Sequence, residues 1–235
     1  MTQCSHLSKI QLYFIDSTFG DQAIIDLSIS LESLSNISFL LLDLQKSSIN
    51  NQEASELGSI LASCKNLEYL TLNLKDNYHI GAQGTKGLFS ELLTFQNIQT
   101  FILYFLLTKI GNEGLVSVSN FLSQCPLLSR LHLYLGQTGI GLSGIQSLLY
   151  SFSICTSLSN LQLGIYQLDE ESSSILVKGL ENCQSLHTII LTLGINCPFE
   201  GDLDGEIVDF NDLAKIILKA KFFVKYNIQA NQYFH

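Results

Sequence analysis

Basic residues are scarce in this chain and are spread along it. The 235 residues include 12 lysines and arginines against 21 aspartates and glutamates, which gives a formal net charge of −9 at pH 7. The nearest approach to a basic cluster is Lys215, Lys219, Lys221 and Lys225, whose spacing suits a solvated helix face. Because nucleic acids and anionic lipids are bound mainly by basic surface, we expect neither to be the main partner.

Long apolar runs are also lacking. No segment reaches the roughly 18 consecutive apolar residues that indicate a membrane-spanning helix. The first residues, MTQCSHLSKIQLYF, lack the basic flank, apolar centre and cleavage site of a secretory signal. The sequence therefore predicts no membrane partner and a cytoplasmic, intracellular protein, for which association with the cytoskeleton is one option.

Sequence motifs of catalysis are missing as well. The chain has no HExxH, CxxC, GxSxG or P-loop pattern. Its five histidines have no acidic neighbour at the spacing of a metal site or a catalytic triad. We therefore expect no enzyme activity, no cofactor and no metal site.

One acidic segment partly matches a calcium-binding loop. Glu200, Asp202 and Asp204 occupy the first, third and fifth positions of an EF-hand pattern. The twelfth position holds Asn211 where a bidentate glutamate is needed, and Pro198 disrupts the incoming helix. We favour a solvated acidic loop and keep calcium binding as the alternative.

What the chain has in abundance is one short pattern, in which an apolar fourth residue leads into alternating apolar positions. It occurs seven times, as CSHLSKIQLYF (4–14), LSNISFLLLDL (34–44), CKNLEYLTLNL (64–74), FQNIQTFILYF (95–105), CPLLSRLHLYL (125–135), CTSLSNLQLGI (155–165) and CQSLHTIILTL (183–193). From Leu7 to Leu186, the fourth residues of successive repeats are 28 to 31 residues apart. Units of this size bury their apolar face only against a neighbour, so the period predicts stacked repeats.

Each repeat combines two periodicities. After the fourth residue, apolar groups recur at every second position, as at Leu70, Leu72 and Leu74, which predicts a short strand with one buried face. Before each of the last six opening residues the spacing is helical, because the positions seven and three residues earlier are apolar, as at Leu57 and Leu61. The sequence therefore predicts alternating strands and helices.

Five of the six cysteines occupy the opening position of a repeat: Cys4, Cys64, Cys125, Cys155 and Cys183. Leu34 and Phe95 fill the same position in the other repeats, which is the behaviour of a small buried hydrophobe. We therefore predict free structural cysteines, which fit a reducing compartment. Cys197 lies outside the repeat and is expected to be a more exposed free thiol.

The pattern LxxLxLxL is followed by a loop, an I-G-x-x-G segment (80–84, 110–114 and 140–144) and an amphipathic helix that ends in cysteine. This arrangement resembles the leucine-rich repeats of the ribonuclease-inhibitor-like type, over residues 4 to 230. The resemblance implies an α/β leucine-rich repeat solenoid of about seven to eight repeats. It is a curved horseshoe with a parallel β-sheet on the concave face and α-helices on the convex face, and it usually serves as a protein-binding surface.

The chain departs from that family in its loops. The asparagine usual eight residues after the first leucine is replaced in every repeat, for example by Lys75 and Leu106. We therefore expect no asparagine ladder to satisfy the loop backbone. An extra apolar residue precedes that position, as at Leu74 and Phe105, and predicts a longer strand with backbone pairing carried further along the sheet.

We expect a single domain over residues 1–235, because 46% hydrophobic and 14% charged residues can supply one continuous core. Regular repeats are assigned to 4–194, an irregular acidic loop to 195–209, and a terminal helix with a degenerate strand to 210–230. Phe223 is taken as the fourth residue of the eighth repeat.

Strand residues between the inward leucines must point to the opposite face of the sheet, where they form two rows. The rows are Gln11, Leu41, Thr71, Ile102, His132, Gln162 and Ile190, and Tyr13, Asp43, Asn73, Tyr104, Tyr134, Gly164 and Thr192. From them we take eight candidate partner-binding residues: Tyr13, Asp43, Asn73, Ile102, Tyr104, His132, Tyr134 and Gln162. Exposed aromatic clusters are enriched at protein interfaces, although the β-propensity of Tyr and Ile is an alternative explanation.

The sequence thus favours a non-catalytic protein-interaction or scaffold module that binds a protein partner on its concave face. It would be a subunit or fragment of a larger intracellular or cytoskeletal assembly. The alternative is a regulator of a partner enzyme, either an inhibitor or a GTPase activator, because relatives of this repeat type do both.

Overall fold

Strands and helices alternate along the chain in a computed structural model, which describes residues 6–18, 20–32, 34, 36–166, 170–194 and 223–224. The strands are β1 (Lys9–Tyr13), β2 (Phe39–Asp43), β3 (Tyr69–Asn73), β4 (Thr100–Tyr104), β5 (Arg130–Gly136), β6 (Asn160–Tyr166), β7 (Thr188–Gly194) and β8 (Phe223–Val224). The helices are α1 (Asp21–Glu32), α2 (Asn51–Ser63), α3 (Ala82–Leu92), α4 (Gly111–Ser123), α5 (Leu142–Ile154) and α6 (Glu170–Leu180).

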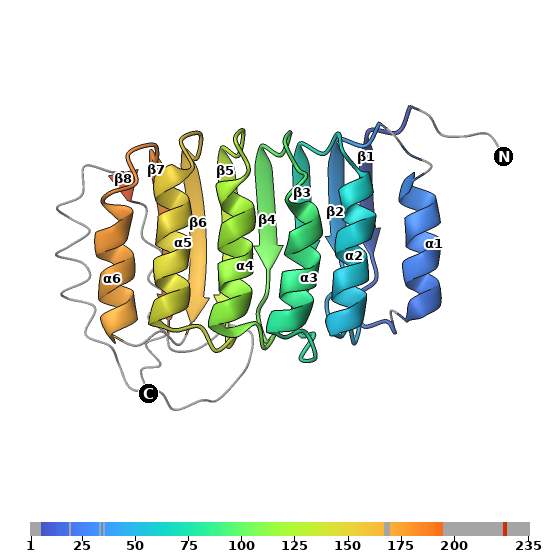
Figure 1. Ribbon diagram of the computed structural model, residues 1–235, viewed down its shortest axis with the longest axis horizontal. Coiled ribbons are helices and arrows are strands. Elements are labelled where there is room, and N and C mark those ends of the chain that lie inside the picture. The colour runs from blue at the N-terminus through green and yellow to red at the C-terminus, as the bar shows by residue number, and fades with distance from the viewer. Residues whose placement is uncertain are drawn as a thin grey trace, which may run out of the picture.

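The strands form one parallel sheet in chain order, from β1 to β8. Each residue pairs with its counterpart in the next repeat, as Leu72 does with Leu103 and Leu103 with Leu133. The helices stand side by side over one face of this sheet (Figure 1). The predicted fold is therefore confirmed: the chain is a leucine-rich-repeat solenoid with its sheet on the concave side and its helices on the convex side.

The inward face of the sheet and one stripe of each helix make a continuous core, as the two periodicities predicted. Leu70, Leu72 and Leu74 are fully buried on the sheet side. On the helix side, both predicted apolar positions are buried in all six helices, as Leu57 and Leu61 are in α2. Burying each leucine stabilises the fold by about 1.5–3 kcal/mol.

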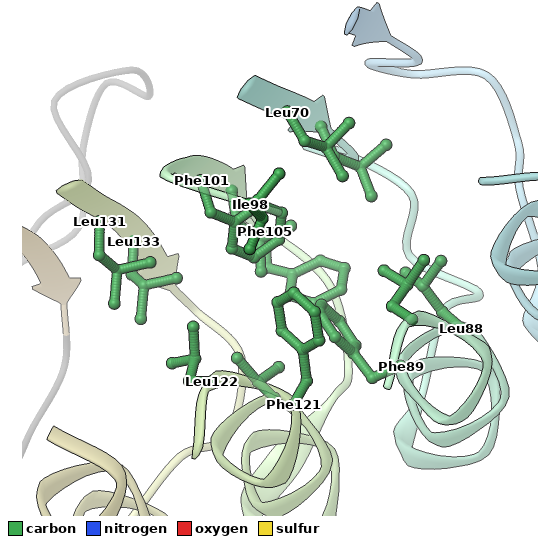
Figure 2. Close-up of a cluster of buried hydrophobic side chains, with 14 of the residues drawn as sticks. Leu70, Leu88, Phe89, Ile98, Phe101, Phe105, Phe121, Leu122, Leu131 and Leu133 are labelled. Carbon is green, nitrogen blue, oxygen red and sulfur yellow. The ribbon is translucent and has the colours of Figure 1, made fainter. Parts of the chain in front are cut away.

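Phenylalanine takes over from leucine around β4. Phe89 of α3 and Phe121 of α4 point toward the sheet and meet Phe101 and Phe105 (Figure 2). The ring centroid of Phe121 lies 5.3 Å from that of Phe89 and 5.2 Å from that of Phe101. Edge-on and tilted contacts of this kind are favoured by the ring quadrupole. They pack the inward side of β4, the strand that carries Tyr104 on its other side.

The cysteines of the described repeats are buried free thiols, as predicted: Cys64, Cys125, Cys155 and Cys183. Cys125 Sγ donates to the carbonyl oxygen of Phe121 at 3.3 Å, and Cys155 Sγ donates to that of Leu122 at 3.2 Å. Each of these carbonyls also accepts a backbone N–H, from Gln124 at 2.9 Å and from Cys125 at 3.2 Å. A thiol here therefore fills the core and adds a second bond to a helix end, which leucine cannot do. Cys4 and Cys197 lie outside the described residues.

In place of the asparagine ladder that the family has, a mixed ladder of serine, asparagine and threonine side chains bonds the loop backbone. The ladder lies ten residues after the first leucine of the motif and consists of Ser17, Ser47, Asn77 and Thr108. Asn77 Oδ1 accepts from the backbone nitrogens of Ser47 at 3.1 Å and Ile49 at 2.9 Å, and its Nδ2 donates to the carbonyl oxygen of Leu44 at 2.8 Å. Serine and threonine replace asparagine at a shifted position, which hid the ladder in the sequence.

Longer strands are confirmed for β5, β6 and β7, which have seven residues, but are wrong for β1 to β4, which have five. In β2 and β3 the last side chains end the strand, because Asp43 Oδ1 accepts from the nitrogen of Gln45 and Asn73 Oδ1 from that of Lys75, both at 3.1 Å. Backbone pairing nevertheless continues, as from Leu44 nitrogen to Asn73 oxygen at 2.9 Å.

Asparagine joins neighbouring helices at their N-termini. Asn51 Oδ1 of α2 accepts from the backbone nitrogens of Gly81 at 2.7 Å and Gly84 at 3.0 Å, at the start of α3. Asn112 makes the same pair of bonds to the start of α5. A Cβ on Gly84 would lie 2.7 Å from Asn51 Cα, so the second glycine of I-G-x-x-G allows this close approach.

The last described strand is two residues out of the predicted register. Thr188 pairs with Phe223 and Ile189 with Val224. Because Thr188 lies two residues after Leu186, Phe223 starts the strand and is not the fourth residue of its repeat. The prediction placed Phe223 at the position of Leu186 because the repeat pattern is degenerate in this part of the sequence. The acidic segment 195–209, with its calcium alternative, and the helix expected from 210 lie outside the described residues.

Candidate protein-binding face

The concave face of the sheet carries three rows of outward side chains. Two of them, here called the middle row and the last row, are the rows predicted from the sequence, with the predicted register from β1 to β7. The first row, which the sequence analysis missed, consists of Lys9, Phe39, Tyr69, Thr100, Arg130, Asn160 and Thr188. Extending the alternation two residues toward the start of each strand would have found it.

All eight predicted binding residues lie on this concave face. Tyr13 on β1 is 59% exposed. The other seven are half-buried: Asp43, Asn73, Ile102, Tyr104, His132, Tyr134 and Gln162. The register brings Ile102, Tyr104, His132 and Tyr134 together on β4 and β5, whereas the polar residues of β2 and β3 form a separate corner.

Tyr104 and Tyr134 form a parallel stack, with ring centroids 4.6 Å apart and an angle of 2° between the ring planes. Both rings pack on Leu106, which is 3% exposed and belongs to a small apolar cluster separate from the main core. On the other side of the stack, a Cβ on Gly164 would lie 2.9 Å from Tyr134 Cδ1. The absent side chain of Gly164 therefore leaves room for the ring of Tyr134 to lie toward β6.

Burial shifts the titration of two groups in this cluster. It raises the pKa of the Tyr104 phenol, and the nearby Tyr69 and Asp43 add to that shift. It lowers the pKa of His132 from its ordinary value of 6.5, with a further contribution from Arg130. Both groups are therefore neutral at pH 7, so the centre of the concave face offers uncharged hydrogen-bonding groups on an apolar surface.

Asp43 and Asn73 form a polar corner at the ends of β2 and β3. Asn73 Nδ2 donates to Asp43 Oδ1 at 3.0 Å. The carboxylate of Asp43 also accepts the backbone bond that ends its strand. These bonds fix the orientation of both side chains, so the corner presents a negative charge at a defined place.

A second aromatic stack lies in the row that sequence reasoning missed. The rings of Phe39 and Tyr69 have centroids 4.2 Å apart and an angle of 11° between their planes. The Nζ of Lys9 lies 4.3 Å from the centroid of the Phe39 ring, which is cation–π geometry. The start of β1 to β3 therefore carries its own aromatic surface.

The histidine and the carboxylate among the eight predicted binding residues lie far apart. His132 on β5 and Asp43 on β2 are three strands apart, which is about 14 Å at the usual strand spacing and too far to exchange a proton. Among the described residues, no group of three or more His, Cys, Asp or Glu is placed to hold a metal ion. No helix in the described ranges is long and apolar enough to cross a membrane.

Comparison with known proteins finds similarity among solved structures. No protein-family model and no curated protein sequence matches the chain. A solved structure of leiomodin-1 actin-binding site 2 matches with a TM-score of 0.50 and 14% sequence identity, over 72% of this chain and 90% of that chain. At this identity the likeness shows a shared leucine-rich-repeat fold.

Proposed function

We propose that this chain is a non-catalytic interaction or scaffold module that binds a protein partner on its concave face. The proposal rests on the Tyr104–Tyr134 stack with Leu106, an apolar cluster outside the main core on a face that no described helix covers. Tyrosines supply a large contact area at a low cost in side-chain entropy. Half-exposed aromatic surface of this kind is typical of interaction sites.

The neighbouring fold supports a protein as the partner. Leiomodin-1 actin-binding site 2 is named for binding actin, so actin is the first candidate partner to test. We also propose that the repeats are of the ribonuclease-inhibitor-like type, because each described helix has 11 to 13 residues. The four unpaired cysteines of the described repeats support an intracellular location.

The test is photo-cross-linking from the two faces. Benzoylphenylalanine is incorporated either at His132 on the concave face or at Tyr150 of α5, a convex residue that is 68% exposed. Each labelled protein is irradiated with purified actin, as monomer and as filament, and in the cells that express the chain. We expect a discrete protein adduct from His132 and not from Tyr150. Adducts from Tyr150 alone, or none from His132, would overturn the proposal.

A further inference from the structure

The apolar side chains of the concave face follow a diagonal across four strands. The Phe39–Tyr69 stack lies in the first row, on β2 and β3. Ile102 lies in the middle row of β4, and the Tyr104–Tyr134 stack lies in the last row, on β4 and β5. We call these five residues the diagonal track. All five are half-buried, so each leaves part of its side chain exposed on the concave face.

The two stacks are linked through the centre of the sheet. Thr71 lies in the middle row of β3, between the stacks and beside Ile102 in the register. Tyr69 is also near enough to Tyr104 to contribute to the raised pKa of the Tyr104 phenol, after the larger effect of burial. One occupant can therefore touch both aromatic pairs together.

Opposite charges border the track on its two sides. Asp43, with Asn73 bonded to it, lies at the ends of β2 and β3 on one side. Arg130, which is exposed, lies at the start of β5 on the other side. A molecule on the track thus meets a negative flank and a positive flank, which together would fix its orientation.

The track favours a helix over an extended segment. Strands in the middle of the sheet pair with both neighbours, so they offer no free edge to which a peptide strand can be added. An α-helix satisfies its own backbone and needs only side-chain contacts. The diagonal crosses from β2 to β5 and advances four residues along the strand direction, which makes it about 20 Å long. A helix of about 13 residues has that length.

We propose that the concave face recognises a single amphipathic α-helix of a partner protein, about four turns long and laid along the diagonal track. Its apolar stripe covers the two aromatic stacks. Basic residues line the flank that meets Asp43, and acidic residues line the flank that meets Arg130. This proposal rests on the proposed function, because it assumes that the concave face binds a protein.

Peptide display on the intact chain tests this proposal. One library holds 14-residue helical peptides with an apolar stripe and randomised flanks. The other holds peptides of the same apolar content with proline at every fourth position, which cannot form a helix. We expect the helical library to enrich at least tenfold more, with basic residues on one flank and acidic residues on the other. Enrichment of the proline library alone, or of neither library, would overturn the helix.

Substitutions in the chain show where on its surface the selected peptides bind. We expect affinity to fall at least tenfold both in Phe39→Ala/Tyr69→Ala and in Tyr104→Ala/Tyr134→Ala, with no change in the convex control Tyr150→Ala. If only the Tyr104→Ala/Tyr134→Ala variant loses affinity, the diagonal track is wrong and the proposed function still stands. Unchanged affinity in both double variants would remove the concave face itself.

A surface variant keeps the test independent of folding. Arg130 is exposed, so Arg130→Glu leaves the aromatic stacks in place. Peptides selected for binding to this variant should be basic instead of acidic on the flank that meets residue 130. The same flank charges selected by both proteins would contradict the proposed orientation.

Discussion

Three buried threonines show how differently single hydroxyl groups are treated in this fold. Thr85 Oγ1 donates to the carbonyl oxygen of Gly81 at 2.9 Å, and Thr108 Oγ1 donates to that of Phe105 at 2.8 Å. Thr71 is buried as well, but its hydroxyl has no hydrogen bond within the described residues. The first two hydroxyls stabilise the backbone around them, whereas the hydroxyl of Thr71 lowers the stability of the protein.

Replacing Thr71 by valine should therefore stabilise the free protein. The isosteric methyl removes an unpaired buried hydroxyl, and we expect the free energy of unfolding to rise by about 1 kcal/mol. The matched control Thr108→Val breaks a buried hydrogen bond and should lower it by about 1 kcal/mol. Urea denaturation of the three proteins measures both changes. A loss in Thr71→Val as large as that in Thr108→Val would show that the hydroxyl has a structural partner.

The buried thiols make stability depend on alkaline pH. Burial raises the pKa of Cys155 and of Cys183 from an ordinary value of 9.0 to about 11, with Cys183 adding to the shift at Cys155. Because the folded pKa lies above the unfolded one, this contribution to stability is complete below about pH 9 and is lost as the pH rises toward 11.

We therefore expect the free energy of unfolding to fall between pH 9 and pH 11. Urea denaturation over that range measures the slope, and the variant Cys155→Ala/Cys183→Ala serves as the control because tyrosines and lysines titrate there too. The variant should lose less stability over this range than the wild-type protein does. Equal slopes in the two proteins would contradict the account of the thiols as buried neutral groups.

At the scale of the elements, the solenoid is held together by contacts that recur from one repeat to the next. Strands pair in register through their backbones, and helices meet through close approaches such as that of Gly84 to Asn51. Asn51 differs from an ordinary helix cap because it lies in one helix and satisfies the start of the next. Its loss should therefore weaken the junction between two repeats.

Replacing Asn51 by alanine tests this junction. Two backbone N–H groups at the start of α3 lose their acceptor, so we expect the free energy of unfolding to fall by about 1–2 kcal/mol. Gln52 is the neighbouring control, because its side chain bonds only Glu56 on the same exposed helix face, at 2.9 Å. Gln52→Ala should change stability by less than about 0.5 kcal/mol. Equal effects of the two substitutions in chemical denaturation would rule out the inter-helix role.

The strands and helices could be predicted from the sequence because each apolar position recurs in several repeats. Leu72, Leu103 and Leu133 occupy one position in successive strands and give the period, the buried face and the register together. The ladder through Asn77 was missed, because serine and threonine fill its other positions. The stacking of Tyr134 on Tyr104 depends on side-chain rotation across neighbouring strands and on the missing side chain of Gly164, which no periodicity records.

At the scale of the whole molecule, stacking converts single outward residues into a surface. Each repeat adds one strand beside the last, so seven strands give rows about 29 Å long. The described helices all lie on the other side, so no described helix covers this face of the sheet (Figure 1). The central claim is that the concave face binds a protein through its aromatic residues.

Binding measurements test that claim most directly. They compare the affinity of the partner identified by cross-linking for the wild-type protein, for Tyr104→Ala, for Tyr134→Ala and for the double variant. Tyr150→Ala is the control, because it removes an exposed tyrosine from the convex face. Thermal unfolding is recorded alongside, since loss of the stack itself costs about 0.5–1.5 kcal/mol of stability. We predict that each concave substitution weakens binding by about 1–3 kcal/mol and that Tyr150→Ala does not. Wild-type affinity in a folded double variant would contradict the claim.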